Sequence, residues 1–208
     1  MSTRLRAPLE QHPLRVSLNG SVEPSDPVPS DLVPSDLVIG AEDPRSEDVR
    51  SLLEKHLAFA HEVTPAGHVH ALEVERLVDP SVTFFSARRG GVLVGVGALR
   101  RLDDTHAELK SMHTSEVARG RGVGRAMVAY ILEFAARCHY QRVSLETGTM
   151  EAFAPARSLY ARAGFVPCDP FGGYTANPHS TCMTISLSSL QPGPGTVGET
   201  RTGPGVTP

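Results

Sequence analysis

The sequence has few of the features that mark secreted, membrane-bound or nucleic-acid-binding proteins. Its three cysteines, Cys138, Cys168 and Cys182, are odd in number and form no Cys-x-x-Cys pair, so we expect buried thiols and no disulfide framework. The sequence contains no apolar segment typical of a signal peptide and no run of about 18 apolar residues. The net charge of −3 and the lack of aromatic residues among the basic ones disfavour nucleic acid as a partner. We therefore expect a cytoplasmic protein without a membrane or nucleic-acid partner.

Length and composition favour one folded domain between two flanking segments. With 208 residues, of which 40% are hydrophobic, the chain can bury a normal core. Residues 1–36 are rich in proline and repeat the pattern Pro-Ser-Asp-x-Val, so we expect a disordered N-terminal arm, for which partner binding stays open. Residues 189–208 are rich in glycine and proline and are expected to form a disordered tail. The folded domain is therefore predicted at residues 37–188.

Hydrophobic periodicity within the predicted domain indicates a mixture of strands and helices. Strands are expected at 37–39, 82–87, 92–99, 107–114, 142–146, 165–166 and 182–187, and helices at 47–61, 72–77, 123–138 and 154–163. The helix at 123–138 is long enough to serve as a crossover, so the strands at 107–114 and 142–146 are predicted to be parallel. The two strands that flank Gly90-Gly91 are predicted to form an antiparallel hairpin. The sequence thus predicts an α/β fold.

A glycine-rich segment separates the strand at 107–114 from the helix at 123–138. It reads Arg119, Gly120, Arg121, Gly122, Val123, Gly124 and Arg125. Glycine removes the Cβ atoms that would keep a phosphate away from the backbone and allows the positive φ at which successive N–H groups converge. The helix start adds unpaired N–H groups and a partial positive charge, and the three arginines add to this field. The segment therefore predicts a phosphate-binding loop, and a plain glycine turn is the alternative.

Two familiar glycine motifs do not fit this segment. A P-loop requires Gly-Lys-Ser/Thr, whereas Gly124 is followed by Arg-Ala. A dinucleotide-binding fingerprint that starts at Gly120 or Gly122 requires glycine at position 125 or 127, which are arginine and methionine. The pattern Arg/Gln-x-x-Gly-x-Gly/Ala after a strand instead resembles the acetyl-CoA pyrophosphate loop of the GCN5-related N-acetyltransferases (GNAT).

A second motif strengthens this resemblance. Residues 156–165, Ala-Arg-Ser-Leu-Tyr-Ala-Arg-Ala-Gly-Phe, are similar to the family's Ala-x-x-Leu-Tyr-x-x-x-Gly-Phe segment. The resemblance implies the GNAT acyl-CoA N-acyltransferase fold, with a mixed, mostly antiparallel sheet, a parallel pair of strands joined by the loop helix, and flanking helices. It also implies transfer of the acetyl group of acetyl-CoA to a primary amine of a small molecule or peptide in a ternary complex. An acyl-CoA sensor or a catalytically silent interaction module on the same fold is the alternative, and a homodimer stays open.

The resemblance also assigns roles to individual residues. It places the pyrophosphate at residues 119–125, and it places the pantetheine arm of acetyl-CoA along the backbone of Met112, His113 and Thr114. It places Tyr160 near the cofactor sulfur, where Tyr160 is expected to be the general acid. Phe153 stands where the family often has asparagine, so the usual amide contact to the cofactor cannot be made.

The general base is the least determined part of the prediction. The resemblance points to Glu108, which lies eleven residues before Arg119, and the alternative is a carboxylate paired with Lys110 or an arginine. Glu146 alternates with buried-looking residues at the end of its strand and could meet the substrate amine, although a structural salt bridge is equally compatible. His70 is expected to line the substrate site. No cysteine or carboxylate completes a zinc-ligand spacing around this histidine, so no metal is expected.

Overall fold

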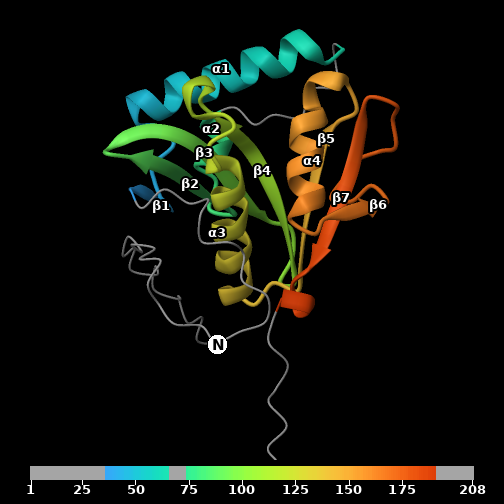
Figure 1. Cartoon of the computed structure of the whole chain (residues 1–208). Helices are drawn as coiled ribbons and strands as arrows, with labels where there is room; N and C mark the ends of the chain where they lie inside the picture. Colours follow the sequence, from blue (N-terminus) through green and yellow to red (C-terminus); the bar gives the residue numbers. More distant parts are fainter. Residues whose placement is uncertain (1–35, 66–73, 191–208) are drawn as a thin grey trace, which may run out of the picture.

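The structure is a computed structural model that describes residues 36–65 and 74–190. Most of the expected N-terminal arm, most of the expected tail and His70 lie outside these residues. Within them, seven strands form one sheet in the order β1-β2-β3-β4-β5-β7-β6 (Figure 1). The strands are β1 Leu37–Ala41, β2 Val82–Arg89, β3 Val92–Arg101, β4 His106–Thr114, β5 Arg142–Gly148, β6 Val166–Cys168 and β7 Ser180–Ser186. The predicted mixed α/β architecture is confirmed.

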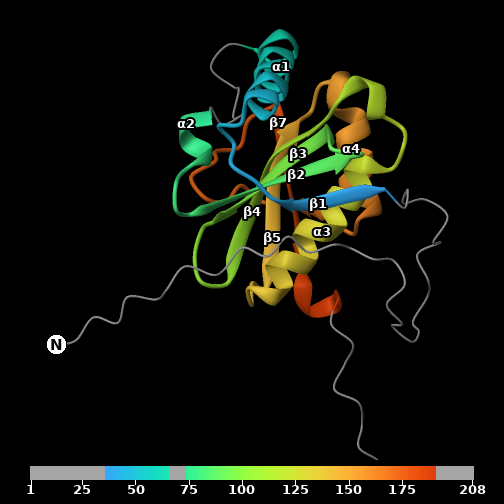
Figure 2. The same cartoon turned by 90° about the vertical axis from the view of Figure 1, so that its left-hand side faces the viewer.

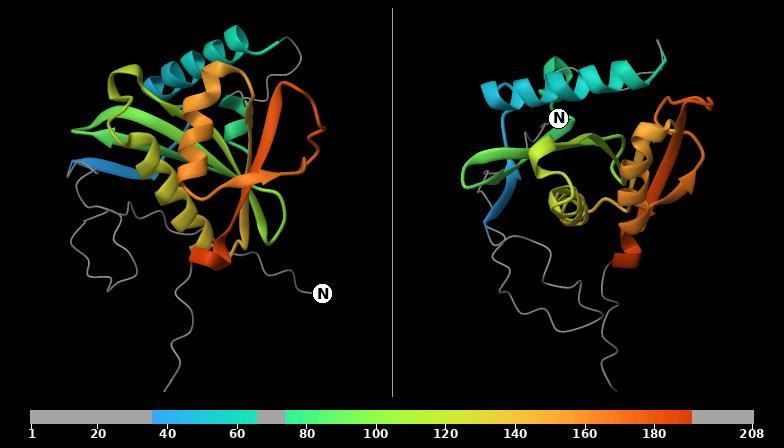
Figure 3. Two further views of the ribbon diagram at one scale, coloured as in Figure 1. Left: turned by 45° about the vertical axis from the view of Figure 1, so that its right-hand side comes forward. Right: turned by 45° about the horizontal axis from the view of Figure 1, so that its top comes forward.

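Helices cover both faces of the sheet. The helices are α1 Glu47–Val63, α2 Val74–Leu77, α3 Val123–Arg137 and α4 Ala154–Arg162. Helices α3 and α4 lie next to each other on one face, and α1 runs across the end of the sheet where β4 and β5 are farthest apart (Figures 1 and 3). Figure 2 shows β1 at one edge of the sheet. No helix in the described ranges is long and apolar enough to cross a membrane.

Helices α1 and α3 each pack on the sheet with an apolar stripe. On α3, Val123, Met127, Ile131 and Ala135 recur every four residues and are at most 1% exposed. On α1, the stripe formed by Val49, Leu52, Leu53 and Ala60 is buried, and its first three residues pack against β2 and β3 in a second core. The thiols differ from the expectation: Cys182 is buried, Cys168 is half-buried, and Cys138 is exposed because it caps the end of α3 beyond the stripe.

Strands β4 and β5 are parallel, as predicted, but they pair over only three residues. His106, Ala107 and Glu108 of β4 pair with residues 142–144 of β5, and beyond this point the two strands separate. A bulge accompanies the separation. Between the pairs Ala98–Lys110 and Val96–His113, two residues of β4 lie opposite one residue of β3, and Ser111 has a φ of +52°. The bulge bends β4 and leaves the edge of residues 109–114 unpaired toward β5. The candidate functional site lies in this opening between β4 and β5.

Candidate functional site

The glycine-rich loop presents free N–H groups at the start of α3. Gly120 and Gly122 have φ values of +71° and +81°, so the predicted left-handed conformation is confirmed at both. Ala126 N–H donates to Gly122 O at 3.0 Å, and in the described chain no bond is found from the N–H groups of residues 123–125. Gly124 serves close packing, because a Cβ atom there would lie 3.2 Å from Leu159 Cδ2 of α4. The loop therefore combines three free donors with the positive end of a helix dipole.

A large cavity of about 640 Å³ opens beside this loop. It is lined by Met112, His113 and Thr114 of β4, by Arg119, Gly120, Gly122, Val123, Gly124 and Arg125, and by residues of α1 and α4. Arg121 is exposed and does not line it. Arg125 carries a buried Nη2 atom without a hydrogen-bond partner, and Arg162 of α4 adds a cation that the motif search did not find. The cavity thus collects most of the predicted cofactor-binding residues on one wall.

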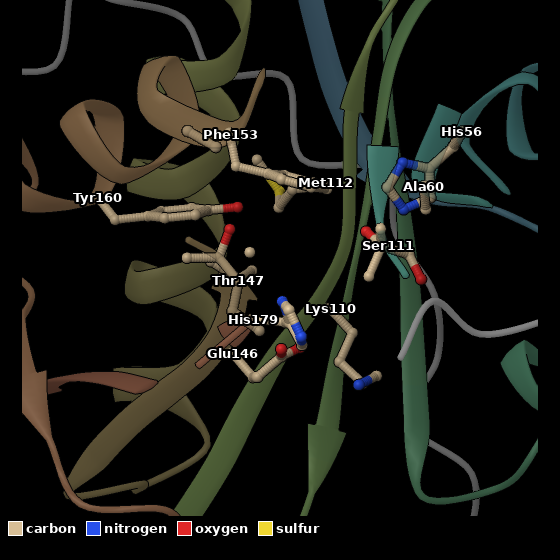
Figure 4. Close-up of a pocket in the computed structure, with 14 residues that line it drawn as sticks. His56, Ala60, Lys110, Ser111, Met112, Glu146, Thr147, Phe153, Tyr160 and His179 are labelled. Atoms are coloured by element: carbon tan, nitrogen blue, oxygen red, sulfur yellow. The ribbon is translucent and has the colours of Figure 1, made fainter. Parts of the chain in front are cut away.

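A small cavity of about 110 Å³ adjoins the large one between β4 and β5. Five residues line both cavities: His56, Met112, Phe153, Ala156 and Tyr160. The Tyr160 hydroxyl points toward Thr147 at the centre of the opening (Figure 4). Tyr160 is 7% exposed, and this burial raises the pKa of its phenol. The predicted acid therefore lies at the junction of the two cavities.

Phe153 places an apolar ring at the position where an asparagine side chain was expected from the resemblance. A Cβ atom on Gly148 would lie 2.4 Å from Phe153 Cδ2, so the ring lies directly on the backbone at the end of β5. The same ring meets Phe59 of α1 edge to face, with centroids 5.5 Å apart. Phe153 therefore lines both cavities with an apolar ring and offers no side-chain hydrogen bond to a ligand.

Glu108 is the centre of a buried ionic cluster and does not line either of these two cavities. Its side chain is fully buried and forms ion pairs with Arg100 and with Lys110, whose Nζ lies 3.1 Å from Glu108 Oε1. Tyr174 O–H donates to the same Oε1 atom at 2.6 Å. We call these four residues the Glu108 cluster. The expectation that Glu108 takes a proton from the acceptor does not fit this geometry, and the alternative, a paired structural carboxylate, is the arrangement found.

The small cavity carries the other candidate carboxylate. Glu146 of β5 lines it together with Lys110 of β4 and His179, which precedes β7. The three side chains converge on one side of the opening, below Tyr160 in the view of Figure 4. Glu146 therefore lines the cavity between β4 and β5, and its meeting with a substrate amine stays a prediction.

Two histidines lie at the wall between α1 and β4: His113, which was expected to contact the cofactor through its backbone, and His56, which no motif indicated. The rings of His56 and His113 are 5.1 Å apart at their centroids and tilted by 57°. Burial lowers the pKa of each to about 4, and His113 also lowers the pKa of His56, so both rings are neutral at pH 7. The signal for His56 was its position in an otherwise apolar stripe of α1, between Leu52 and Ala60.

The chain is similar to known acetyltransferases in sequence and in fold. Residues 47–165 match the model of the acetyltransferase (GNAT) family. The chain is 42% identical over 149 residues to the uncharacterized N-acetyltransferase YsnE of Bacillus subtilis, covering 72% of this chain and 99% of that protein. It is 40% identical over 139 residues to the uncharacterized N-acetyltransferase YedL of Escherichia coli, covering 67% and 87%. The fold matches a GNAT acetyltransferase of Elizabethkingia anophelis with acetyl-CoA bound, with a TM-score of 0.55 at 16% identity, covering 74% and 99%. This chain therefore belongs to the GNAT acetyltransferase family.

Proposed function

We propose that this acetyltransferase transfers the acetyl group of acetyl-CoA to a primary amine of a small molecule by direct attack in a ternary complex. The observation that carries the proposal is the meeting of the two cavities at Tyr160. The large cavity is bounded by the free N–H groups of the loop, and the small cavity contains Glu146. A small cavity of about 110 Å³ favours a compact acceptor over a peptide.

The residues of the large cavity fit the parts of acetyl-CoA. The three free N–H groups of residues 123–125 and the unpartnered Nη2 of Arg125 suit the pyrophosphate. The unpaired edge of residues 109–114 provides backbone groups for the pantetheine amides, because β5 has already separated from β4 there. When bound, acetyl-CoA supplies an acyl group on a thioester, whose leaving group is a thiolate with a reference pKa of about 8.5.

Proton removal from the acceptor is assigned to Glu146, directly or through a water molecule. An alkylamine with a pKa of about 10.4 must lose its proton before it can attack, which costs about 4.6 kcal/mol at pH 7. Glu146 lines the small cavity, whereas Glu108 is enclosed by its ion pairs. Glu108 instead holds Lys110 and Tyr174 in place.

Tyr160 is assigned to donate a proton to the departing thiolate. With reference pKa values of about 10 for the phenol and about 8.5 for the thiol, the transfer costs about 2 kcal/mol. Burial raises the pKa of Tyr160, but a thiolate that forms in the same apolar surroundings also gains affinity for a proton. The two effects oppose each other, so the transfer remains accessible.

Release of free CoA thiol from acetyl-CoA in the presence of a panel of amines tests the proposal. With an accepted amine, Tyr160→Phe is expected to lower kcat by about 10²-fold or more with little change in CoA affinity. Tyr130→Phe is the matched control, because Tyr130 is a buried tyrosine that packs against Phe85 away from both cavities. CoA binding without thiol release from any amine would favour an acyl-CoA sensor instead. Full kcat in Tyr160→Phe would remove Tyr160 from the role of acid.

A further inference from the structure

Two side chains of opposite charge face the small cavity from the two separated strands. Lys110 reaches it from β4 and Glu146 from β5 (Figure 4). Among the described residues, the ion pairs of Lys110 include Glu108 but not Glu146. The cavity therefore presents a positive group on one strand and a negative group on the other.

Lys110 has one hydrogen-bond donor left for a ligand. An ammonium group carries three N–H donors. Lys110 Nζ donates to Glu108 Oε1 at 3.1 Å and to the Tyr174 hydroxyl at 2.6 Å, and these are the two acceptors found in the described chain. The side chain is 8% exposed, so bulk water has little access to the third N–H. A hydrogen-bond acceptor on a ligand could therefore bind the third N–H group of Lys110.

Lys110 feels negative charge from both separated strands. Glu108 of β4 forms ion pairs with Arg100 and Lys110, and Glu146 of β5 also acts on Lys110 by its charge. Arg100 is 26% exposed and can be hydrated, whereas Lys110 is nearly enclosed and lines the small cavity. Burial accordingly lowers the pKa of Lys110. A ligand that carries both a carboxylate and an amino group would match the charges of Lys110 and Glu146 together.

We infer that the acceptor amine also bears a carboxylate, so that the substrate is an amino acid in the broad sense. Its carboxylate accepts a hydrogen bond from Lys110 Nζ. Its amino group lies near Glu146, in the cavity that Tyr160 also lines. The inference rests on the proposed function and specifies its acceptor. A planar carboxylate suits the limited volume of about 110 Å³ better than a larger anion does.

Matched amine pairs test the inference. Glycine, β-alanine and 4-aminobutyrate are compared with their carboxamides and with aminoalkylphosphonates of equal chain length, by thiol release from acetyl-CoA. We expect the best carboxylate to exceed its amide in kcat/KM by about 10- to 100-fold, which is the range for losing a hydrogen bond to a charged group. Equal or better activity with the amides or the phosphonates overturns the inference while the proposed function stands.

A variant of Lys110 tests whether this residue causes the preference for a carboxylate over an amide. In Lys110→Met, which leaves Glu108 paired with Arg100, the ratio of carboxylate to amide kcat/KM is expected to fall to within about threefold of one. Lys55→Met changes an exposed lysine on α1 and is expected to keep the ratio. An unchanged ratio in Lys110→Met overturns the assignment of Lys110. If no amine releases thiol, titration of the amino acids into the CoA complex still decides the inference, because a failure to bind refutes it.

Discussion

Removing the charge of Glu108 is expected to destabilise the protein and to leave the proton-transfer chemistry in place. Glu108→Gln would leave Arg100 and Lys110 without their shared counter-charge. Breaking a buried ion pair in this way costs about 3–5 kcal/mol. The loss of folding free energy at pH 7 has an upper bound of about 4.6 kcal/mol. The bound is the cost of deprotonating a lysine of pKa about 10.4 at this pH, because Lys110 can become neutral instead of remaining charged without a partner. The thermal midpoint should fall by roughly 6–18 °C for a domain of this size.

The pH dependence of this loss has a definite sign. Burial lowers the pKa of Lys110 in the folded state, and removal of Glu108 lowers it further, so the unfolded chain binds more protons than the folded chain. Stability contributed by Lys110 therefore rises with pH between its lowered folded pKa and about 10.4, by up to about 1.4 kcal/mol per pH unit. The midpoint difference between Glu108→Gln and the wild type should accordingly shrink between pH 7 and pH 9.

Thermal unfolding followed by circular dichroism measures these effects. Glu133→Gln is the control, because Glu133 forms an exposed pair with Arg137 on α3, and its midpoint should stay within about 3 °C of wild type. The double variant Glu108→Gln/Lys110→Met removes both charges and should recover at least half of the loss. A midpoint of Glu108→Gln within about 2 °C of wild type, or a double variant less stable than the single one, would refute the reasoning.

Two further predictions concern the chemistry and the loop. Glu146→Gln should lower kcat/KM at pH 7 by about 10²–10³-fold, and the loss should shrink as the pH approaches the pKa of the free amine. The pH profile is measured beside that of Glu133→Gln, which changes an exposed residue and should keep the wild-type profile. A parallel loss in both variants at every pH would contradict the assignment of the base. Gly122→Val places a β-branched residue at a φ of +81° and should weaken CoA binding by at least about tenfold in isothermal titration, whereas Gly90→Ala at the distant β2–β3 turn should bind as wild type does. Unchanged affinity in a folded Gly122→Val protein would rule out the loop as the pyrophosphate site.

The features that were predictable from the sequence are those with a local signal. The stripe on α3, the glycine turns and the crossover helix each depend on residues close together in the chain, and they sufficed to predict that β4 and β5 are parallel. The Glu108 cluster depends instead on strand register and on a distant loop: Arg100 faces Glu108 across β3 and β4, and Tyr174 lies 66 residues farther along. A one-residue spacing match could not distinguish a buried ion pair from an exposed base.

The contact between His56 and His113 likewise depends on residues far apart in the sequence. His56 on α1 meets His113 on β4, 57 positions farther along the chain and two residues beyond the bulge residue Ser111. Periodicity could mark His56 as a polar residue in an apolar stripe, but it could not name the partner. The burial of both rings, which keeps them uncharged, is a property of the assembled sheet.

The contact between Tyr174 and Glu108 limits how the protein can be re-engineered. The segment 169–179 contributes His179 to the wall of the small cavity, while its Tyr174 is bonded to the carboxylate located where β4 and β5 part. Grafting the corresponding segment of a relative to change the accepted amine would therefore also remove a donor from a fully buried carboxylate. Libraries that vary this segment should keep Tyr174 fixed, or vary Glu108 and Lys110 together with it, since otherwise altered selectivity will be selected alongside lost stability.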